Sequence, residues 1–352
     1  MGRRDTGTDD PRVRVRPGKG SRPRTKIRPD YSTARRGQVY RVDRGRYHII
    51  MSDDGTHVSA VKAKELPRGA IVVGDIVAVV GDLSGKKDTL ARIVDIDERR
   101  TALRRTAEEG ESAGSERVIV ANADQLIIVT ALARPQPRPG MIDRCLVAAY
   151  DAHMRPILIF TKADLADADE LIQIYQPLDI DMYVSRLDET QPAHAESAES
   201  SSAALADLHE IKAALRGHSS VLVGHSGVGK STLINALIPQ AERTTGEVNT
   251  VTGRGRHTST SVVAFPFGAD GLVIDTPGVR SFGLAHVEPL DLLRAFEDLH
   301  ELAVQCPRGC LHEDGGVGCA FDTAADARTR ARVASYRRLV ASRMKNDPSW
   351  IW

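Results

Sequence analysis

Short apolar and β-branched runs alternate with turn residues in the first third of the chain. Five such runs, at residues 38–42, 47–51, 57–61, 75–80 and 90–96, predict β-strands. Breaker residues separate them, as at Asp54-Gly55 and Ser84-Gly85. Five short strands in about sixty residues favour a small barrel of the OB type over residues 35–98, and an SH3-like barrel is the alternative.

The pattern changes after residue 98. Residues 125–130, 156–160, 219–223 and 272–274 are apolar runs that predict buried strands, and residues 141–153 have the spacing of a helix. Strands that alternate with helices predict an α/β domain with a largely parallel sheet, which we assign to residues 99–285. Residues 286–352 then form a mostly helical C-terminal domain, and the acidic stretch 188–204 is either a linker or an ordered segment.

Composition adds one feature, the segregation of charge. The 352 residues are 41% hydrophobic and 27% charged, with a net charge of +1, which is typical of a globular protein of more than one domain. Residues 1–28 nevertheless hold ten Lys or Arg against three Asp. We expect residues 1–34 to be a disordered basic arm, which either contacts nucleic acid or is a solvated tail.

The chain has no apolar run of membrane-spanning length and no apolar core behind its basic amino terminus. We therefore expect a cytoplasmic protein without a membrane partner. We also expect a monomer, although nothing in the sequence bears on the oligomeric state. Cationic and aromatic residues on the first barrel hairpin favour contact with RNA, although a solvated surface is the alternative. These residues are Arg41, Arg44, Arg46, Tyr47 and His48.

A phosphate-binding loop stands between an apolar strand and a helical run. Its residues are Gly224, His225, Ser226, Gly227, Val228, Gly229, Lys230, Ser231 and Thr232. Both the residue pattern and its position between a strand and a helix match a P-loop. The glycines allow backbone N–H groups to face phosphate, Lys230 reaches the terminal phosphates, and the Ser231 hydroxyl binds Mg²⁺. The loop alone does not distinguish ATP from GTP.

Asp275-Thr276-Pro277-Gly278 follows the apolar run at residues 272–274. In this position the carboxylate of Asp275 holds Mg²⁺ through water, and the Gly278 amide meets the γ-phosphate. The alternative is an ordinary strand that ends in a Pro-Gly turn.

A base-reading motif stands upstream of the P-loop. The segment Thr161-Lys162-Ala163-Asp164 is similar to the Asn-Lys-x-Asp signature of GTPases, in which the carboxylate accepts hydrogen bonds from N1 and N2 of guanine. Adenine lacks this pair of donors, so Asp164 is the residue that excludes ATP. Thr161 stands where the signature has Asn. Ser185 occupies the place of a second base-contacting loop.

The order of these motifs is permuted. Asp164 precedes Lys230, which precedes Asp275, whereas in ordinary GTPases the phosphate loop comes first. A permuted chain keeps the same site because the sheet needs only its strands to be adjacent. The segment after Gly278 leads directly into the C-terminal domain, which favours transmission of a γ-phosphate-dependent movement to that domain.

The C-terminal domain carries a cluster of Cys306, Cys310, His312 and Cys319. Three thiolates and one imidazole are a complete tetrahedral set for one structural Zn²⁺, and reduced cysteines without metal are the alternative. Cys145 lies in an apolar helical pattern and is expected in the core. A basic helical tail follows the cluster and suits either RNA phosphate or solvent. Its cations are Arg328, Arg330, Arg332, Arg337, Arg338, Arg343 and Lys345.

The barrel, the permuted nucleotide domain and the Cys/His cluster together resemble the ribosome small-subunit-dependent GTPase A family, over about residues 35–340. Residues 98–105, 121–124 and 253–258 are similar to that family's linker, first G-domain strand and switch region. The resemblance implies GTP hydrolysis stimulated by the small (30S) subunit, a role in its late maturation, and contact of the barrel and metal domain with 16S rRNA. The family's Cys/His spacing is one residue longer in the first gap and one shorter in the last.

Hydrolysis needs a positioned water, and Val279 replaces the Gln that orients it in Ras-like proteins. We therefore expect a slow free enzyme. The resemblance points to His257 as the catalytic residue that acts once the ribosome orders it, although a His in a polar segment is also simply solvated. Thr258 is the residue chosen to complete Mg²⁺ coordination, with Ser259 and Thr260 as rivals.

The residues thus favour a GTP hydrolase that acts on the ribosome. An RNA-docking assembly factor, in which GTP mainly sets binding affinity, is the first alternative. A P-loop ATPase or kinase is the second, because only Asp164 argues against adenine.

Overall fold

A computed structural model describes most of the chain. The described residues are 31, 34–43, 45–67, 69–106, 116–186, 198–239, 262–268, 271–276, 282, 284 and 287–344. The expected basic arm lies outside them except for residues 31 and 34, as do His257, Thr258 and Gly278.

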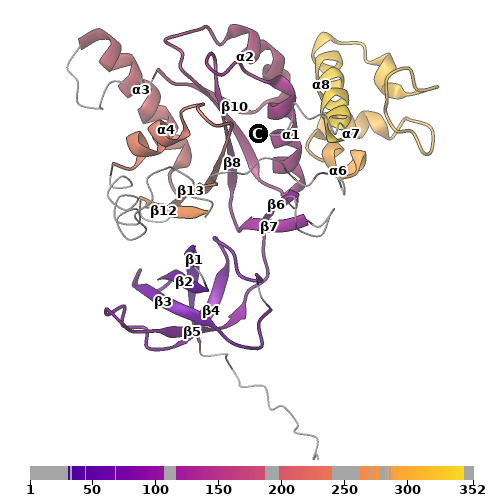
Figure 1. The fold of residues 1–352 in the computed structure, drawn as a ribbon. Helices are drawn as coiled ribbons and strands as arrows, with labels where there is room; N and C mark the ends of the chain where they lie inside the picture. Colours follow the sequence, from indigo (N-terminus) through magenta and orange to yellow (C-terminus); the bar gives the residue numbers. More distant parts are fainter. Residues whose placement is uncertain are drawn as a thin grey trace, which may run out of the picture. The chain divides into compact units, whose positions relative to one another are not determined.

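A closed β-barrel forms the first domain of the described chain (Figure 1). Its strands are β1 (Arg35–Asp43), β2 (Arg46–Met51), β3 (His57–Lys62), β4 (Ile76–Gly81) and β5 (Ala91–Ile96). β1 pairs with both β2 and β4, β2 pairs with β3, β4 pairs with β5, and the parallel pairing of β3 with β5 closes the barrel. Val39, Ile49 and Ile93 are fully buried in its interior, because alternate residues of each strand face inward. The predicted strands are therefore confirmed.

An antiparallel pair, β6 (Ala102–Thr106) and β7 (Glu116–Ala121), follows the barrel. The sequence pattern did not predict it. Residues 121–124, which resemble a first G-domain strand, lie at the end of β7 and in the turn before β8. The first strand of the next sheet is instead β8 (Gln125–Ala131).

A mostly parallel sheet is the frame of the second domain. In the described chain its strands run in the order β10 (Asp181–Val184), β9 (Arg155–Thr161), β8, β11 (Ser219–Val223), β13 (Gly271–Asp275) and β12 (Val263–Phe267). Neighbours from β10 to β13 are parallel, and β12 is antiparallel to β13. The predicted parallel sheet is confirmed. The pairing of Arg41 with Val263 also joins β1 to β12.

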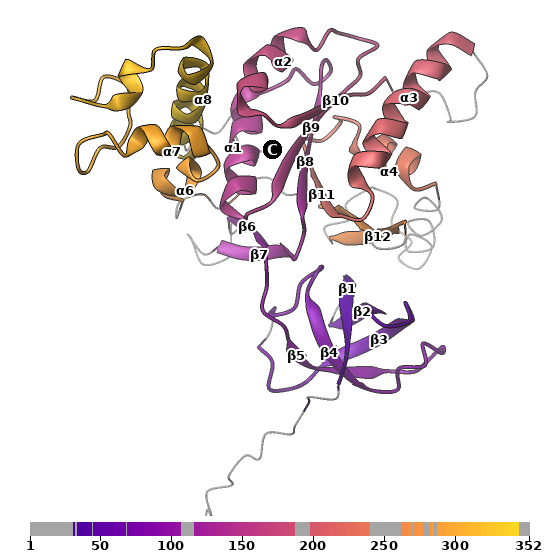
Figure 2. The same cartoon turned by 180° about the vertical axis from the view of Figure 1, so that it is seen from behind.

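Helices cover both faces of this sheet (Figure 2). Leu126 and Ile128 of β8 belong to the cluster that includes α1 (Pro139–Asp151) and α2 (Asp169–Tyr175). Ile127 and Val129 belong to the cluster that includes α3 (Ala198–Leu215) and α4 (Lys230–Leu237). Successive side chains of a strand point to opposite faces, so an unbroken apolar strand is needed between two helical layers. α3 begins inside the acidic stretch 188–204, and residues 188–197 lie outside the described chain.

The described C-terminal region is mostly helical. It contains α6 (Pro289–Leu293), α7 (Glu297–Ala303), the 3-10 helix η2 (Ala320–Thr323) and α8 (Ala327–Met344). A second 3-10 helix, η1 (Gln176–Leu178), follows α2 in the nucleotide domain. No helix among the described residues is long and apolar enough to cross a membrane.

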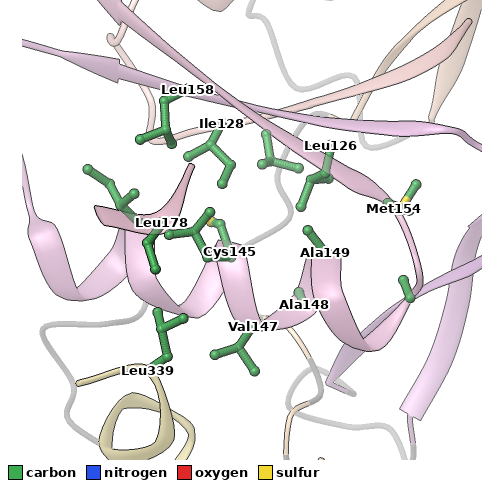
Figure 3. Packing of buried hydrophobic residues seen from close by; sticks show 14 of the residues in the cluster. Leu126, Ile128, Cys145, Val147, Ala148, Ala149, Met154, Leu158, Leu178 and Leu339 are labelled. Atoms are coloured by element: carbon green, nitrogen blue, oxygen red, sulfur yellow. The ribbon is translucent and has the colours of Figure 1, made fainter. Parts of the chain in front are cut away.

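α1 is buried between the sheet and α8. In Figure 3, Cys145 and Ala149 lie on the side of α1 that faces Leu126 and Ile128, and Val147 lies on the side of Leu339 from α8. Cys145 is fully buried, and burial raises the pKa of its thiol. The expectation that Cys145 belongs to the core is confirmed.

Candidate nucleotide-binding site and metal centre

The carboxyl ends of neighbouring parallel strands bring the sequence motifs together. Thr161 ends β9, Ser185 follows β10, Gly224 follows β11 and Asp275 ends β13. Open parallel sheets bind ligands at this edge. Motifs separated by more than a hundred residues thus come to one edge of the sheet.

The P-loop conformation depends on its glycines. A Cβ atom on Gly224 would lie 2.3 Å from the carbonyl oxygen of Val129, too close for any side chain. Gly227 and Gly229 have φ angles of +79° and +92°, which glycine adopts without strain. α4 begins at Lys230, directly after the loop, so its free N–H groups face the position of a phosphate.

Lys230 lies among the carbonyl groups of its own loop. Its ammonium donates a hydrogen bond to the Gly224 carbonyl and another, at 3.2 Å, to the His225 carbonyl. Burial lowers the pKa of Lys230, and the carboxylate of Asp275 opposes this shift. An anionic phosphate would offer the ammonium a stronger partner than these neutral carbonyls.

Asp275 presents a carboxylate oxygen that fits a cation site. Burial raises the pKa of Asp275 and the charge of Lys230 lowers it. Its Oδ1 atom is buried, and no residue of the described chain donates a hydrogen bond to it. A buried carboxylate oxygen without a donor is suited to accept a hydrogen bond from a ligand, and a water molecule bound to Mg²⁺ would supply such an O–H donor. Thr276 fixes the strand end through a 2.7 Å bond from its hydroxyl to the Leu222 carbonyl.

Thr161 and Lys162 connect the base motif to the P-loop. The Thr161 hydroxyl lies 2.5 Å from the Val228 carbonyl oxygen and 3.3 Å from that of Thr130. The Lys162 ammonium donates to the carbonyl groups of Gly227 and Arg134, at 2.8 and 2.7 Å. Thr161 therefore makes a P-loop contact although it departs from the usual Asn. The sequence motif contained no signal for the Arg134 contact.

The second base loop lies beside the first. The Ser185 amide donates to Phe160 at 2.7 Å, and the Ala163 amide donates to the Ser185 carbonyl at 3.3 Å. Asp164 is exposed, so its carboxylate is accessible to a ligand. Arg186, which stands where Ala is usual, binds Asp207 of α3 at 3.0 Å.

The Cys/His residues of the C-terminal domain form a compact cluster. Their ligand atoms lie within 4.8 Å of one another, and the cysteines are free of disulfides. Metal bonds of about 2.0–2.3 Å to one tetrahedral ion fit such a cluster. The amides of His312 and Ala320 donate to the sulfur atoms of Cys310 and Cys306, at 3.4 and 3.2 Å. These donors stabilise thiolates.

The His312 imidazole is oriented by its surroundings. It is buried and stacks on Phe321, with ring centroids 4.5 Å apart. Its Nδ1 faces the sulfur atoms of Cys306 and Cys319, at 3.5 and 4.0 Å. Burial lowers the pKa of His312, which favours the neutral imidazole that binds metals. The residues therefore fit a metal ion despite the altered spacing.

The prediction that the α8 arginines serve RNA phosphate or solvent is wrong for Arg332 and Arg338. Arg332 is 7% exposed and binds Asp298 at 2.6 Å and the Pro177 carbonyl at 2.8 Å. Arg338 binds the buried Asp143 at 3.0 Å. Both guanidinium groups therefore have partners within the protein, although one nitrogen of each, Nε of Arg332 and Nη2 of Arg338, is buried without a hydrogen bond to a described residue. The side chain of Arg343 and the whole of Lys345 lie outside the described residues.

The expected aromatic contact of the barrel is also wrong for Tyr47. Its ring is 5% exposed and packs in the barrel interior, where no base reaches it. Arg41 and His48 both approach Asp43, at 2.6 and 3.4 Å. Arg46 is exposed, and Arg44 lies outside the described residues.

Together these features define a class: a P-loop nucleotide-binding fold with a guanine-type base loop, circularly permuted, behind an N-terminal β-barrel. A family model described as RsgA GTPase matches residues 96–285. That match covers more than half of the chain, and the chain belongs to the RsgA GTPase family.

Curated relatives carry the name Small ribosomal subunit biogenesis GTPase RsgA. One from Pseudomonas aeruginosa (strain UCBPP-PA14) is 40% identical over 238 residues, which are 65% of this chain and 65% of that protein. One from Pseudomonas syringae pv. syringae is 36% identical over 253 residues, 69% of this chain and 68% of that protein. The matched region thus spans 65% of the length of the first of these relatives.

Two solved structures share the fold. The crystal structure of YjeQ from Thermotoga maritima has a TM-score of 0.59 at 24% identity and covers 87% of this chain and 98% of that one. The structure of YloQ, a circularly permuted GTPase, has a TM-score of 0.58 at 22% identity and covers 90% of this chain and 98% of that one.

Proposed function

We propose that this protein hydrolyses GTP in the maturation of the small ribosomal subunit. The observation that carries the proposal is the pair of side chains, Thr161 and Lys162, that bind P-loop carbonyls. These contacts tie the base-reading loop to the loop of Lys230, which supports a site in which one guanine nucleotide would span both loops. The name shared by the curated relatives supports the ribosomal substrate.

The proposed roles follow from the chemistry of each group. Lys230 binds the terminal phosphates, and Asp164 accepts from the guanine N1 and N2 donors. Ser231 and Asp275 hold Mg²⁺, for which the unpartnered Asp275 oxygen is the support. We further propose that the Gly278 amide binds the γ-phosphate, that His257 is the catalytic residue and that Thr258 completes the coordination of Mg²⁺.

For the metal centre we propose one structural Zn²⁺. Three thiolates and an imidazole are the ligand set that Zn²⁺ prefers, and all four protein positions are filled, which leaves none for a substrate. A closed set supplies folding energy and no Lewis acid. The centre therefore holds the loop that follows α7 in one conformation.

The proposed partners are GTP, GDP, the small subunit and 16S rRNA, in the cytoplasm. For the barrel we propose the OB type. Among the described strands its sheet has five strands that pair antiparallel, except for β3 and β5, whose parallel pairing closes the barrel. We retain 35–98, 99–285 and 286–352 as the proposed domain limits.

Phosphate release from GTP, measured with and without purified small subunits, tests the function. We expect slow release by the free protein and strong stimulation by the subunits, both abolished in Lys230→Ala. Subunit binding that depends on nucleotide, without stimulation, would support the RNA-docking alternative instead. His257→Ala tests the catalytic residue, because unchanged stimulated turnover would remove His257 from the mechanism.

A further inference from the structure

Arg337 of α8 reaches the loop that carries the metal ligands. Its side chain is 19% exposed. The Nε atom donates to the carbonyl of His312 at 3.0 Å, and Nη2 donates to that of Glu313 at 3.1 Å. The guanidinium also binds the carboxylates of Asp314 and Asp322, at 3.0 and 2.5 Å. One side chain thus joins the segments before and after Cys319.

The loop needs such support because its backbone is strained at a ligand. His312 has a φ angle of +58°, in the left-handed region that residues with a Cβ rarely adopt. A residue with a side chain is strained there, and it persists only where its surroundings fix it. The hydrogen bond from Arg337 to the His312 carbonyl acts on this strained residue.

The charge of Arg337 also suits the centre. Three thiolates, a neutral imidazole and a divalent ion sum to a net charge of −1. A partly buried anionic site is stabilised by a nearby cation. The Nη2 atom of Arg337 lies 4.0 Å from the sulfur atom of Cys319.

We propose that Arg337 is a positioning residue of the metal centre, on which its affinity for the ion depends. The proposal rests on the Zn²⁺ site proposed above. A planar guanidinium binds several carbonyls and carboxylates at fixed angles, whereas a Lys ammonium offers the charge without that fork. Arg337 therefore acts on the ion through the backbone of His312 and through charge.

The next residue along α8 provides a matched control. Arg338 points to other partners, the buried carboxylate of Asp143 at 3.0 Å and the ring of Tyr175, whose centroid is 5.1 Å away. Both belong to the nucleotide domain. Loss of Arg338 removes the same charge from the same helix and leaves every contact of Arg337 to the metal loop in place.

Zinc affinity of the full chain, measured by competition with a chromophoric chelator, tests the proposal. We expect Arg337→Gln to weaken Zn²⁺ binding about 10-fold to 100-fold, the range found for outer-shell partners of metal ligands. Arg337→Lys should fall between it and the wild type, and Arg338→Gln should stay within about twofold of the wild type. Co²⁺-loaded Arg337→Gln should show shifted visible bands, because the ligand geometry changes.

Wild-type affinity in Arg337→Gln, or an equal loss in Arg338→Gln, would overturn the proposal. If Arg337→Gln does not fold, the affinity of Arg337→Lys decides in the same way. If the wild-type chain binds no Zn²⁺, both the proposed metal centre and this inference are refuted. If it binds Zn²⁺ and the affinity does not depend on Arg337, only this inference is refuted.

Discussion

Replacement of Thr161 by Val tests how the two nucleotide loops are joined. Thr161 is 5% exposed, and its hydroxyl lies 2.5 Å from the carbonyl oxygen of Val228 in the P-loop. Val has nearly the same shape and no hydroxyl, so the change removes the hydrogen bond with little effect on packing. The Val228 carbonyl would then face an apolar methyl group.

A buried carbonyl left without its partner costs about 1–3 kcal/mol. Every 1.4 kcal/mol is tenfold in affinity, so GDP binding should weaken by about 5-fold to 150-fold if the whole cost falls on the nucleotide-bound state. Thr161→Ser keeps the hydroxyl and should stay close to the wild type. Thr161→Asn restores the residue usual in GTPases and should also retain affinity.

Calorimetric titration of GDP into these variants measures the effect. The melting temperature without nucleotide must be recorded as well, because it reports the part of the cost borne by the empty protein. If Thr161→Val binds GDP as tightly as the wild type, and melts at the same temperature, the hydrogen bond does not couple the loops.

Other predictions concern the P-loop, the docking of α8 and the metal. Gly224→Ala should abolish nucleotide binding, because its Cβ would lie 2.3 Å from the Val129 oxygen. The control is Gly217→Ala, whose Cβ meets open space but whose φ of +73° is strained for alanine, so it should lower the melting temperature and leave nucleotide binding unchanged. Arg338→Ala leaves the buried Asp143 carboxylate without its cation, with Tyr175 as its remaining side-chain partner. The change should lower the free energy of unfolding by about 1–3 kcal/mol in denaturant titrations, less than for a fully buried pair because Arg338 is partly exposed; no change would refute the role of the pair. Elemental analysis should find one zinc per chain in the wild type and in Cys145→Ser and none in Cys310→Ser, and zinc retained in Cys310→Ser would contradict the assigned ligands.

The strands of the barrel and of the nucleotide domain could be predicted because burial on one or both faces of a strand leaves a clear pattern of apolar residues in the sequence. Alternation marks the barrel strands, as in β2, and the continuous apolar run of β8 marks a strand covered by helices on both sides. Motif spacing likewise predicted the P-loop and the Cys/His cluster, since a phosphate and a metal ion each demand particular groups in a particular order.

Side-chain partners across domains could not be predicted in this way. Arg332, Arg337 and Arg338 look alike in sequence, yet each binds different carboxylates or carbonyls brought close by the fold. Tyr47 was expected at the surface because an aromatic beside Arg residues is typical of RNA-binding barrels. The strand register instead turns it inward, and a shift of one residue would have reversed that.

Titration of Asp164→Asn with purine diphosphates tests the central claim most directly. The wild type should bind GDP at least about 100-fold more tightly than ADP, because a site built to accept hydrogen bonds rejects a base that lacks the donors. In Asp164→Asn an amide N–H replaces one acceptor, so the variant should lose GDP and bind xanthosine diphosphate, whose C2 carries an oxygen. Equal binding of GDP and ADP by the wild type, or full GDP affinity in the variant, would contradict the account.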